Sequence, residues 1–478
     1  MKNKILKLTM IFVVILFITS CEDYLGGDTN IDPNRTSDAS LNTLLPTLLY
    51  YSAESTYFSA SVACQYAQQI GAVTSGGTDA QNENTFGSLW SNIYLNVITN
   101  GNEIIKRGET SDSPYYSGIA KIMIAYNLGL ATSVWENVPF KEADNQLSNF
   151  SPNYDSQQEI YNSIVLLLNE AINDLEADES VFKPGNDDII YKGDLNKWKK
   201  AAHSLKARHL LHLARRGLAN YSDIIDATQK GISSNEDDLQ LIYTERNFNR
   251  WYQVALANNT GNLSTTFSAT FMNLMNGSIQ GIADPRVKLL AYSTGDTYLG
   301  NIPGTGSGGN TRYNNGTSFF GWNFDILAPL QMLTFSETKF IEAEALVNSN
   351  GSIEKAYDAY LAGIVSNMEK IRVSNDEITE FTSDENINIG ASNLKISHVM
   401  TEKYKALFLN PEVWNDLRAY NYSNDIIPGL NLPENHNPDL NGAWIQRGLY
   451  PTSETSRNSD VAKANFKPIS ETMWIFKN

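Results

Sequence analysis

The stretch FSETKFIEAEALVNSNGSIEKAYDAYLAGIVSNMEKI, which covers residues 335–371, decides the fold class of this chain. In each half, apolar residues recur three or four positions apart, which is the spacing of one face of an α-helix. They are Phe340, Ala343 and Leu346 in the first half and Ala356, Tyr360, Ile364 and Met368 in the second. Between the halves, Asn348-Ser349-Asn350-Gly351 has the composition of a turn. The stretch therefore predicts a helical hairpin.

The same apolar spacing recurs earlier in the chain. It predicts helices around residues 119–130, 160–175 and 198–213, the last with Asp194 as its N-cap and Gly217 as its stop. The hairpin resembles a tetratricopeptide unit, but no 34-residue repeat with a common consensus runs through the chain. Gly, Asn, Pro and Ser interrupt the helical pattern between about residues 240 and 325 and beyond Tyr420. We therefore predict a mainly α-helical fold with long irregular loops, and such loops often carry function.

The N-terminus carries an export signal. Lys2, Lys4 and Lys7 precede the apolar run Leu8–Ile18, which is too short for a membrane-spanning helix. Ile18-Thr19-Ser20-Cys21 resembles a lipobox, in which Cys21 becomes the lipidated first residue; an ordinary signal with Cys21 incidental is the alternative. We predict a signal peptide at residues 1–20, a lipidated flexible tether at 21–43 and a single helical domain at 44–478.

Charge and cysteine content narrow the function classes. The chain has 36 basic and 53 acidic residues, and loss of the three lysines in residues 1–20 would leave a formal charge near −20. Such a protein lacks the basic surface that nucleic acid requires, and membrane attachment would depend on the lipid. Cys21 and Cys64 are the only cysteines. If Cys21 carries lipid, Cys64 has no partner and burial must stabilise the fold.

Residues 304–309 contain a formal G-x-G-x-x-G pattern, which in a nucleotide site lies between a strand and a helix. Pro303 precedes the pattern, and no helical periodicity follows it. We interpret this segment as a flexible loop rather than as a phosphate site.

A group of histidines on a predicted helix raises the question of a metal site. His203, His209 and His212 cluster on one helix, but no carboxylate or cysteine accompanies them at ligand spacing, so structural roles are favoured over zinc. No metal or cofactor is predicted.

Glu337, Glu342 and Glu344 might suggest a glycosidase carboxylate pair, but Glu342 and Glu344 point to different faces of their helix. We interpret them as solvated or hydrogen-bonded helix acids. No catalytic signature is found in the sequence.

Aromatic residues beside amides stand out in the irregular segments. A sugar has an apolar face that packs on an aromatic ring, and hydroxyls that need polar partners at its edge. For any single ring, buried packing remains the alternative. The candidate ligand-binding residues are Asn82, Asn84, Phe86, Arg250, Trp251, Tyr252, Tyr313, Asn314, Phe320 and Trp322.

Five blocks in order give the chain a family resemblance. They are Thr132–Ala143 (TSVWENVPFKEA), Asp284–Val287, Leu333–Ala345, Glu402–Phe408 continuing through Glu412–Arg418, and Arg447–Pro451 with Glu454 and Asn458. Together they resemble SusD/RagB-like surface lipoproteins, most closely the SusD-like group with a C-terminal Tyr-Pro-x-x-Glu block. Ser133 and Glu136 stand where that family usually has Asp and Gly.

The resemblance implies a scaffold of tetratricopeptide-like helix pairs whose irregular insertions form a ligand face. It also implies a lipoprotein outside the outer membrane, which covers a SusC-like TonB-dependent transporter and binds oligosaccharides or, in some members, peptides. The resemblance further implies a protein that is not an enzyme. Glu22-Asp23 after Cys21 resembles the acidic export signal of such lipoproteins. The family resemblance also implies that the five blocks identify the fold, whereas the identity of the ligand depends on the binding site.

Three functions follow as hypotheses. The first is a nutrient-binding lipoprotein that binds oligosaccharide and delivers it to the transporter, with peptide as the alternative ligand. The second is an exported helical hydrolase with an unrecognised carboxylate pair. The third is a structural or adhesin-like surface protein without a small ligand.

Overall fold

The fold is mainly α-helical, as predicted, and a computed structural model describes residues 39–143, 149–295, 297–313 and 322–477. The longer helices are α3 (Leu41–Tyr66), α5 (Thr99–Thr110), α6 (Pro114–Trp135), α7 (Gln157–Leu175), α8 (Leu195–Arg215), α13 (Phe335–Asn348), α14 (Ile353–Lys370), α10 (Arg250–Thr260) and α16 (Ile396–Ala406). The shorter ones are α4 (Gly87–Ser91), α9 (Tyr221–Gln229), α11 (Ala269–Met275), α12 (Val287–Leu290), α15 (Asn375–Ser383), α17 (Glu412–Ala419), α18 (Thr452–Arg457) and α19 (Ser459–Ala464). A π-helical segment, η3 (Asn92–Ile98), joins α4 to α5.

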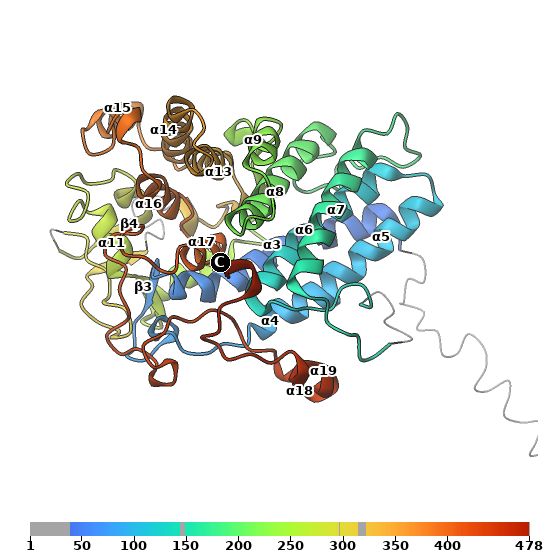
Figure 1. Cartoon of the computed structure of the whole chain (residues 1–478), viewed down its shortest axis with the longest axis horizontal. Helices are drawn as coiled ribbons and strands as arrows, with labels where there is room; N and C mark the ends of the chain where they lie inside the picture. Colours follow the sequence, from blue (N-terminus) through green and yellow to red (C-terminus); the bar gives the residue numbers. More distant parts are fainter. Residues whose placement is uncertain (1–38, 144–148, 296, 314–321, 478) are drawn as a thin grey trace, which may run out of the picture.

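Consecutive helices pack against each other in pairs. Helix α6 packs on α5 and α7, α8 packs on α7 and α9, and α13 packs on α14. Figure 1 shows these helices following one another from α5 on the right to α14 at the upper left. This arrangement confirms the prediction of tetratricopeptide-like helix pairs as a scaffold.

The predicted helix boundaries have the expected caps. Asp194 accepts hydrogen bonds from the backbone N–H groups of Asn196 and Lys197 at the start of α8, and Gly217 beyond its end has φ +74°. The predicted hairpin is confirmed as α13 and α14, and Asn350 lies in the turn with φ +52°.

Helix α3 starts earlier than predicted. Residues 41–43, assigned to the tether, belong to the helix, because Leu41 is buried at its first position. Cys64 on the same helix is unpaired and buried, and burial raises the pKa of its thiol. The lipidation candidate Cys21 lies outside the described residues.

The irregular half of the protein contains three antiparallel strand pairs. These are β1 (Ile70–Ala72) with β3 (Thr265–Phe267), β2 (Leu239–Leu241) with β6 (Leu330–Leu333), and β4 (Ala291–Ser293) with β5 (Thr311–Tyr313). In the first pair, Ile70 lies opposite Phe267. Each pair is short, so these strands tie distant loops together rather than form a layer of their own.

The glycine-rich segment 304–309 is a loop, as predicted, and strand β5 follows it instead of a helix. The Gly304 N–H donates to Oδ2 of buried Asp79 at 3.0 Å. A side chain at Gly306, where φ is +71°, would place its Cβ 2.4 Å from the carbonyl carbon of Thr74. Glycine is therefore required here for the close approach of two loops, and not for a phosphate.

Candidate functional site

Loops from three distant parts of the chain meet at one end of the molecule. The Asn301 amide donates to the Ala72 carbonyl at 2.9 Å, and the Asn435 amide donates to the Ser75 hydroxyl at 2.9 Å. The Asn437 N–H donates to the Ala80 carbonyl. The loop at 71–86 is thus held against both other loops, and its backbone is organised by tertiary contacts.

Three of the predicted ligand rings are buried. Phe86, Trp251 and Tyr313 are exposed by only 3%, 3% and 0%. Phe86 lies 6.0 Å from Trp414 in a stacked arrangement, and Tyr313 lies 4.5 Å from Phe324. Burial of large rings stabilises the core, and it removes these three residues from the set of exposed stacking platforms.

The predicted amides of the first loop are used inside the protein. Asn82 donates to the carbonyls of Gly76 and Gly77, and the Asn84 side chain accepts from the Phe86 N–H. Both side chains shape the loop, which is the role that Asn commonly has in turns.

Two predicted residues, Arg250 and Tyr252, lie half-buried at the start of α10. Asn314 and Phe320 lie outside the described residues, whereas the backbone of Trp322 begins the short helical turn η5 (Trp322–Phe324). The structure does not bring Arg250 and the loop at 71–86 into one described cluster. Of the predicted residues that the structure describes, Arg250 and Tyr252 are those placed beside half-exposed rings.

We call this region the α3–α10 surface. It consists of Tyr50, Tyr51, Tyr57, Phe58, Phe248, Arg250 and Tyr252, all half-buried. The Arg250 guanidinium lies 5.7 Å from the Phe58 ring centre and 6.0 Å from that of Tyr57. It also forms an ion pair of 2.8 Å with buried Glu54 of α3. The ion pair fixes a cation in the middle of an aromatic group.

The chemistry of the α3–α10 surface suits a ligand with apolar faces and polar edges. Burial and the Glu54 carboxylate raise the pKa of Tyr50, so its hydroxyl stays protonated and can donate a hydrogen bond at neutral pH. The rings of Phe248 and Tyr252 meet edge to face at 5.9 Å. Rings that are half-exposed and held by neighbours can stack on a sugar without first ordering.

Sequence reasoning missed the four rings of α3. Tyr50-Tyr51 and Tyr57-Phe58 are seven residues apart, which is two turns of a helix, so both pairs lie on one face. These rings lie in a regular helix, whereas the predicted ligand residues were all taken from irregular segments. An aromatic pair repeated after seven residues in a helix would have identified it.

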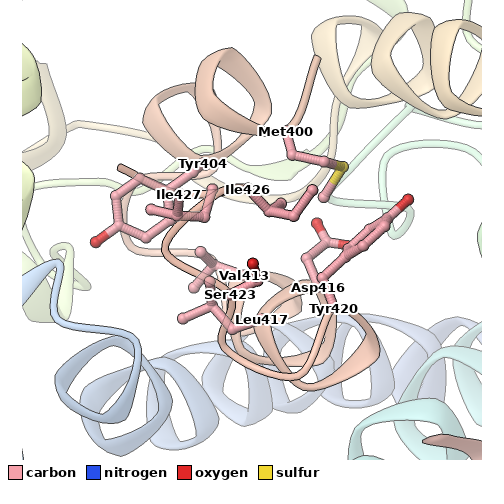
Figure 2. Close-up of a pocket in the computed structure, with 9 residues that line it drawn as sticks. All are labelled: Met400, Tyr404, Val413, Asp416, Leu417, Tyr420, Ser423, Ile426 and Ile427. Carbon is pink, nitrogen blue, oxygen red and sulfur yellow. The ribbon is translucent and has the colours of Figure 1, made fainter. Parts of the chain in front are cut away.

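The described residues include a cavity between α16 and α17 that is too small for a nutrient ligand. Figure 2 shows side chains of both helices and of the following turn, among them Met400, Tyr420 and Ile426, directed toward one another around it. Its volume is about 10 Å³, which is room for a single water at most.

The three predicted helix acids have different surroundings. Glu337 and Glu344 are buried and bind arginines of α8, whereas Glu342 pairs with Lys339 near the surface. The Arg208 guanidinium donates to Glu337 with two hydrogen bonds of 2.6 and 2.7 Å. Their interpretation as hydrogen-bonded helix acids agrees with these contacts, because two of the three lie in structural ion pairs.

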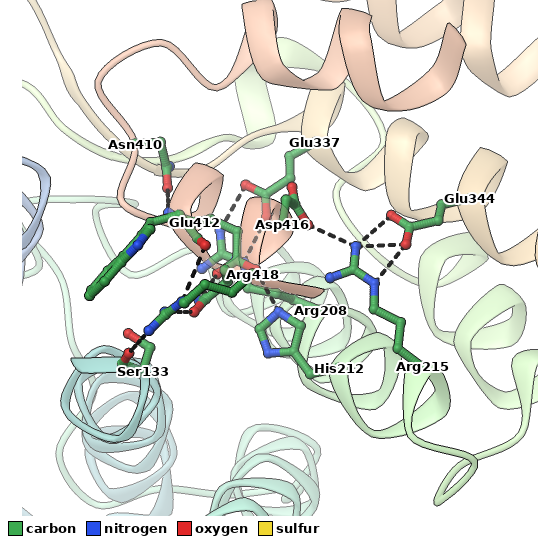
Figure 3. Close-up of polar contacts among 12 residues, drawn as sticks. Ser133, Arg208, His212, Arg215, Glu337, Glu344, Asn410, Glu412, Asp416 and Arg418 are labelled. Atoms are coloured by element: carbon green, nitrogen blue, oxygen red, sulfur yellow. Dashed lines mark hydrogen bonds and ion pairs between the residues drawn. The ribbon is translucent and has the colours of Figure 1, made fainter. Parts of the chain in front are cut away.

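Figure 3 shows that these ion pairs belong to one buried polar region among α8, α13 and α17. Arg215 bridges Glu344 and Asp416, and it lies 2.7 Å from Asp416. Lys403 of α16 lies 2.9 Å from Asp416 and 3.4 Å from Glu344. Burial acts to raise the pKa of Glu344, but the charges of Arg215 and Lys403 outweigh it and hold that pKa below its ordinary value. Glu344 is therefore ionised, and both acids are paired with the same two cations.

A second buried charge cluster joins two further sequence blocks. Arg286 lies 3.0 Å from Glu402, and Lys405 lies 2.9 Å from Asp284. All four side chains are almost fully buried, which requires that their charges be paired. The blocks around residues 284 and 402 thus meet in the core and hold helices in place.

The first and last blocks also meet. The Trp135 indole donates to the Leu449 carbonyl at 2.9 Å, and the Tyr450 hydroxyl donates to the Asn137 carbonyl at 2.7 Å. Glu136, which stands where the family usually has Gly, has φ +71°, and its carboxylate binds Arg447 at 2.7 Å. The backbone thus keeps the conformation that favours glycine, and an ion pair holds the side chain.

Two histidines of α8 are buried, and only one of them, His212, has hydrogen-bond partners among the described residues. His212 binds Glu412 at 2.5 Å and Tyr161 at 2.9 Å, so a carboxylate does accompany it, from a distant block. His209 is buried, and neither of its ring nitrogens has a hydrogen-bond partner among the described residues. Over the part of the chain that the structure describes, no group of three or more His, Cys, Asp or Glu is arranged to hold a metal ion.

We expect the stability of the protein to fall below pH 6.5 because of His209. Burial, His212 and Arg208 lower its pKa well below the ordinary value of 6.5, so below that pH the unfolded state binds more protons than the folded state. Stability is then lost as the pH falls from 6.5 toward the folded-state pKa, by up to about 1.4 kcal/mol per pH unit. Urea unfolding at pH 7.5, 6.5 and 5.5 should show a shallower loss for His209→Leu. Parallel profiles of unfolding free energy against pH for the two proteins would contradict this role of His209. Burial also lowers the pKa of His203, but this residue is present in both proteins and therefore contributes equally to both profiles.

The comparisons with known proteins now identify the family. The chain belongs to the SusD-like family, because the family model SusD-like_2, described as "Starch-binding associating with outer membrane", matches residues 33–451. Members of this family are binding proteins and not enzymes, and the family is associated with the outer membrane. No curated protein matches the sequence. Among the residues that the structure describes, no helix has the length and apolar character needed to cross a membrane.

Solved structures share the fold. A SusD/RagB family protein from Bacteroides thetaiotaomicron matches with a TM-score of 0.75 and 22% identity, over 92% of this chain and 99% of its own. A chitin-binding protein matches with a TM-score of 0.76 and 21% identity, over 92% of this chain and 100% of its own. A chitin-binding SusD homolog from Flavobacterium johnsoniae matches with a TM-score of 0.72 and 17% identity, over 92% of this chain and 99% of its own.

Proposed function

We propose that this protein binds oligosaccharides at the α3–α10 surface and delivers them to a SusC-like TonB-dependent transporter. One observation carries the proposal: two rings of α3, Tyr57 and Phe58, lie beside an arginine that an ion pair holds in place. Half-exposed rings provide stacking faces, and Arg250 with the Tyr50 hydroxyl provides polar partners at the edge. The family as a whole binds nutrients, and two structural relatives are named as chitin-binding.

We further propose that a lipid on Cys21 anchors the protein to the outer membrane, with the ligand surface facing the exterior. The basic and apolar N-terminus, the lipobox-like sequence and Glu22-Asp23 after it support this placement. The outer-membrane association of the family supports it independently. Labelling with an alkyne-tagged fatty acid should mark the intact protein and not a Cys21→Ala variant.

We expect loss of one ring of the α3–α10 surface to weaken oligosaccharide binding about 5- to 10-fold, because one stacking contact provides about 1 kcal/mol. Starch and chitin oligosaccharides, first screened on a glycan array and then titrated by calorimetry, serve as probes. Phe58→Ala and Tyr252→Ala should each show the loss. Phe466→Ala, which removes an exposed ring beyond α19, should bind like the unchanged protein.

Unchanged affinity of both ring variants would remove the α3–α10 surface from the proposal. If no glycan binds and short peptides bind there instead, the ligand belongs to the alternative class. Product formation in the same mixtures would contradict a purely binding role.

A further inference from the structure

A cleft on another part of the molecule has features that the proposed function does not use. It lies between the π-helical segment η3 and helix α18, and its volume is about 580 Å³, within the range of small-molecule sites. Its lining includes Trp90, Tyr94, Leu95, Phe150, Glu454 and Arg457. We call it the Trp90–Arg457 cleft.

The two most exposed large apolar side chains found in the described part of the chain both line this cleft. Leu95 is 70% exposed and Phe150 is 80% exposed. Water contact with such side chains is unfavourable, and a ligand with an apolar body would cover both.

The cleft also contains a carboxylate that forms no ion pair with any described residue. Glu454 accepts a hydrogen bond from the Tyr154 hydroxyl at 2.8 Å, and no described cation lies within ion-pair distance of it. Arg457 follows it by three residues on α18 and also lines the cleft, but no ion pair joins the two side chains. Glu454 is partly buried and is left to attract a cation from solution.

Tyr154, whose hydroxyl donates to Glu454, belongs to a group of aromatic rings. The Trp90 ring centre lies 4.6 Å from that of Tyr94 and 6.1 Å from that of Tyr154. The Trp90 ring itself is buried, so the charge of Glu454, and not a ring face, is what attracts a positive group in this cleft.

Tyr94 supplies a third feature. Its hydroxyl is buried and has no hydrogen-bond partner among the described residues, although the side chain lines the cleft. Burial, followed by the nearby Glu454 and Tyr450, raises its pKa well above the ordinary value, so the hydroxyl remains a donor. A buried donor without an acceptor costs free energy that a ligand carbonyl or hydroxyl would recover.

We infer that the Trp90–Arg457 cleft binds an apolar ligand group that carries a protonated amine. The ammonium lies against Glu454, and the apolar body covers Leu95 and Phe150. The site is separate from the α3–α10 surface, so its occupation does not depend on the oligosaccharide proposal.

Calorimetric titration with a matched pair of probes tests this inference. The amide of the dipeptide Phe-Leu carries a free amino terminus, and its N-acetylated form differs only in the loss of that charge. We expect the free amine to bind at least 10-fold more tightly than the acetylated form. Hexylamine, which has the charge and an alkyl body but no peptide group, distinguishes a simple amine from a peptide as the source.

Two variants localise the effect. Glu454→Gln keeps an oxygen that accepts from Tyr154 and should weaken binding of the free amine at least 10-fold. Tyr94→Phe removes a hydroxyl that has no protein partner, so the fold should tolerate it, and binding should weaken a few-fold. Glu385→Gln, an exposed acid in the loop after α15, controls for the general attraction of an acidic protein for cations and should change nothing.

Equal binding of the free and acetylated dipeptides would overturn the inference, as would equal affinity of the unchanged protein and Glu454→Gln. Absence of binding to every amine probe would also overturn it. None of these results bears on glycan binding, so failure here and failure of the proposed function are distinguishable.

Discussion

Replacing Glu344 with glutamine is expected to lower the free energy of unfolding by about 3–5 kcal/mol, the usual cost of breaking a buried ion pair. The Glu344 carboxylate accepts from Arg215 at 2.7 and 2.8 Å and from the Tyr420 hydroxyl at 2.8 Å. Without its charge, Arg215 and Lys403 share only Asp416. Two buried cations then face one carboxylate, and their desolvation is no longer offset. Urea unfolding followed by circular dichroism measures the loss.

Glu342→Gln is the matched control, because it makes the same chemical change on the same helix. Glu342 pairs with Lys339 at 2.8 Å, and both side chains are partly exposed. Such pairs contribute about 0–1 kcal/mol, so this variant should unfold almost like the unchanged protein. Equal losses for the two variants would show that the buried charge cluster contributes no special stability.

Replacing Trp135 with alanine is expected to cost about 3–5 kcal/mol, the range for removing a large buried ring. Trp135 ends helix α6, is almost fully buried, and lies 4.9 Å from Trp90 and 6.3 Å from Phe86, measured between ring centres. Its indole also binds the Leu449 carbonyl. The variant therefore opens a cavity and loosens the last sequence block from the first.

Trp135→Phe separates these two effects, because it keeps an aromatic ring but leaves the Leu449 carbonyl without its donor. We expect a loss of about 1–3 kcal/mol for this variant. Trp444→Ala is the control at a half-buried ring that stacks on Tyr422 at 4.4 Å, and it should cost less than Trp135→Ala. A Trp135→Ala protein as stable as the Trp444→Ala protein would contradict the argument.

The helices could be predicted because their signals are local. Apolar spacing and capping residues lie within one turn of each other, as at Asp194 before α8 and in the hairpin of α13 and α14. The five sequence blocks were also sufficient to identify the family. Their acids were interpreted correctly as structural, but their partners Arg208 and Arg215 lie 129 residues away from Glu337 and Glu344 and could not be assigned from spacing.

The ligand surface was harder to predict. Phe86 and Tyr313 lie beside amides in irregular segments, as an exposed platform would, yet both rings are buried in the core. The rings of α3 show the reverse. They lie in a regular helix, and four of them are half-exposed: Tyr50, Tyr51, Tyr57 and Phe58. Local composition describes which side chains are present, and not which of them a distant segment will cover.

By itself, the sequence determined the class of this protein: a mainly helical fold and membership of a family of binding proteins. These properties depend on periodicity and on residues that are close together in the chain. Only the tertiary structure decided which rings face solvent, which acids are paired, and that Glu454 accepts from Tyr154 without an ion pair to any described residue. Exposure and pairing depend on contacts between residues hundreds of positions apart, and such contacts exist only once the chain has folded.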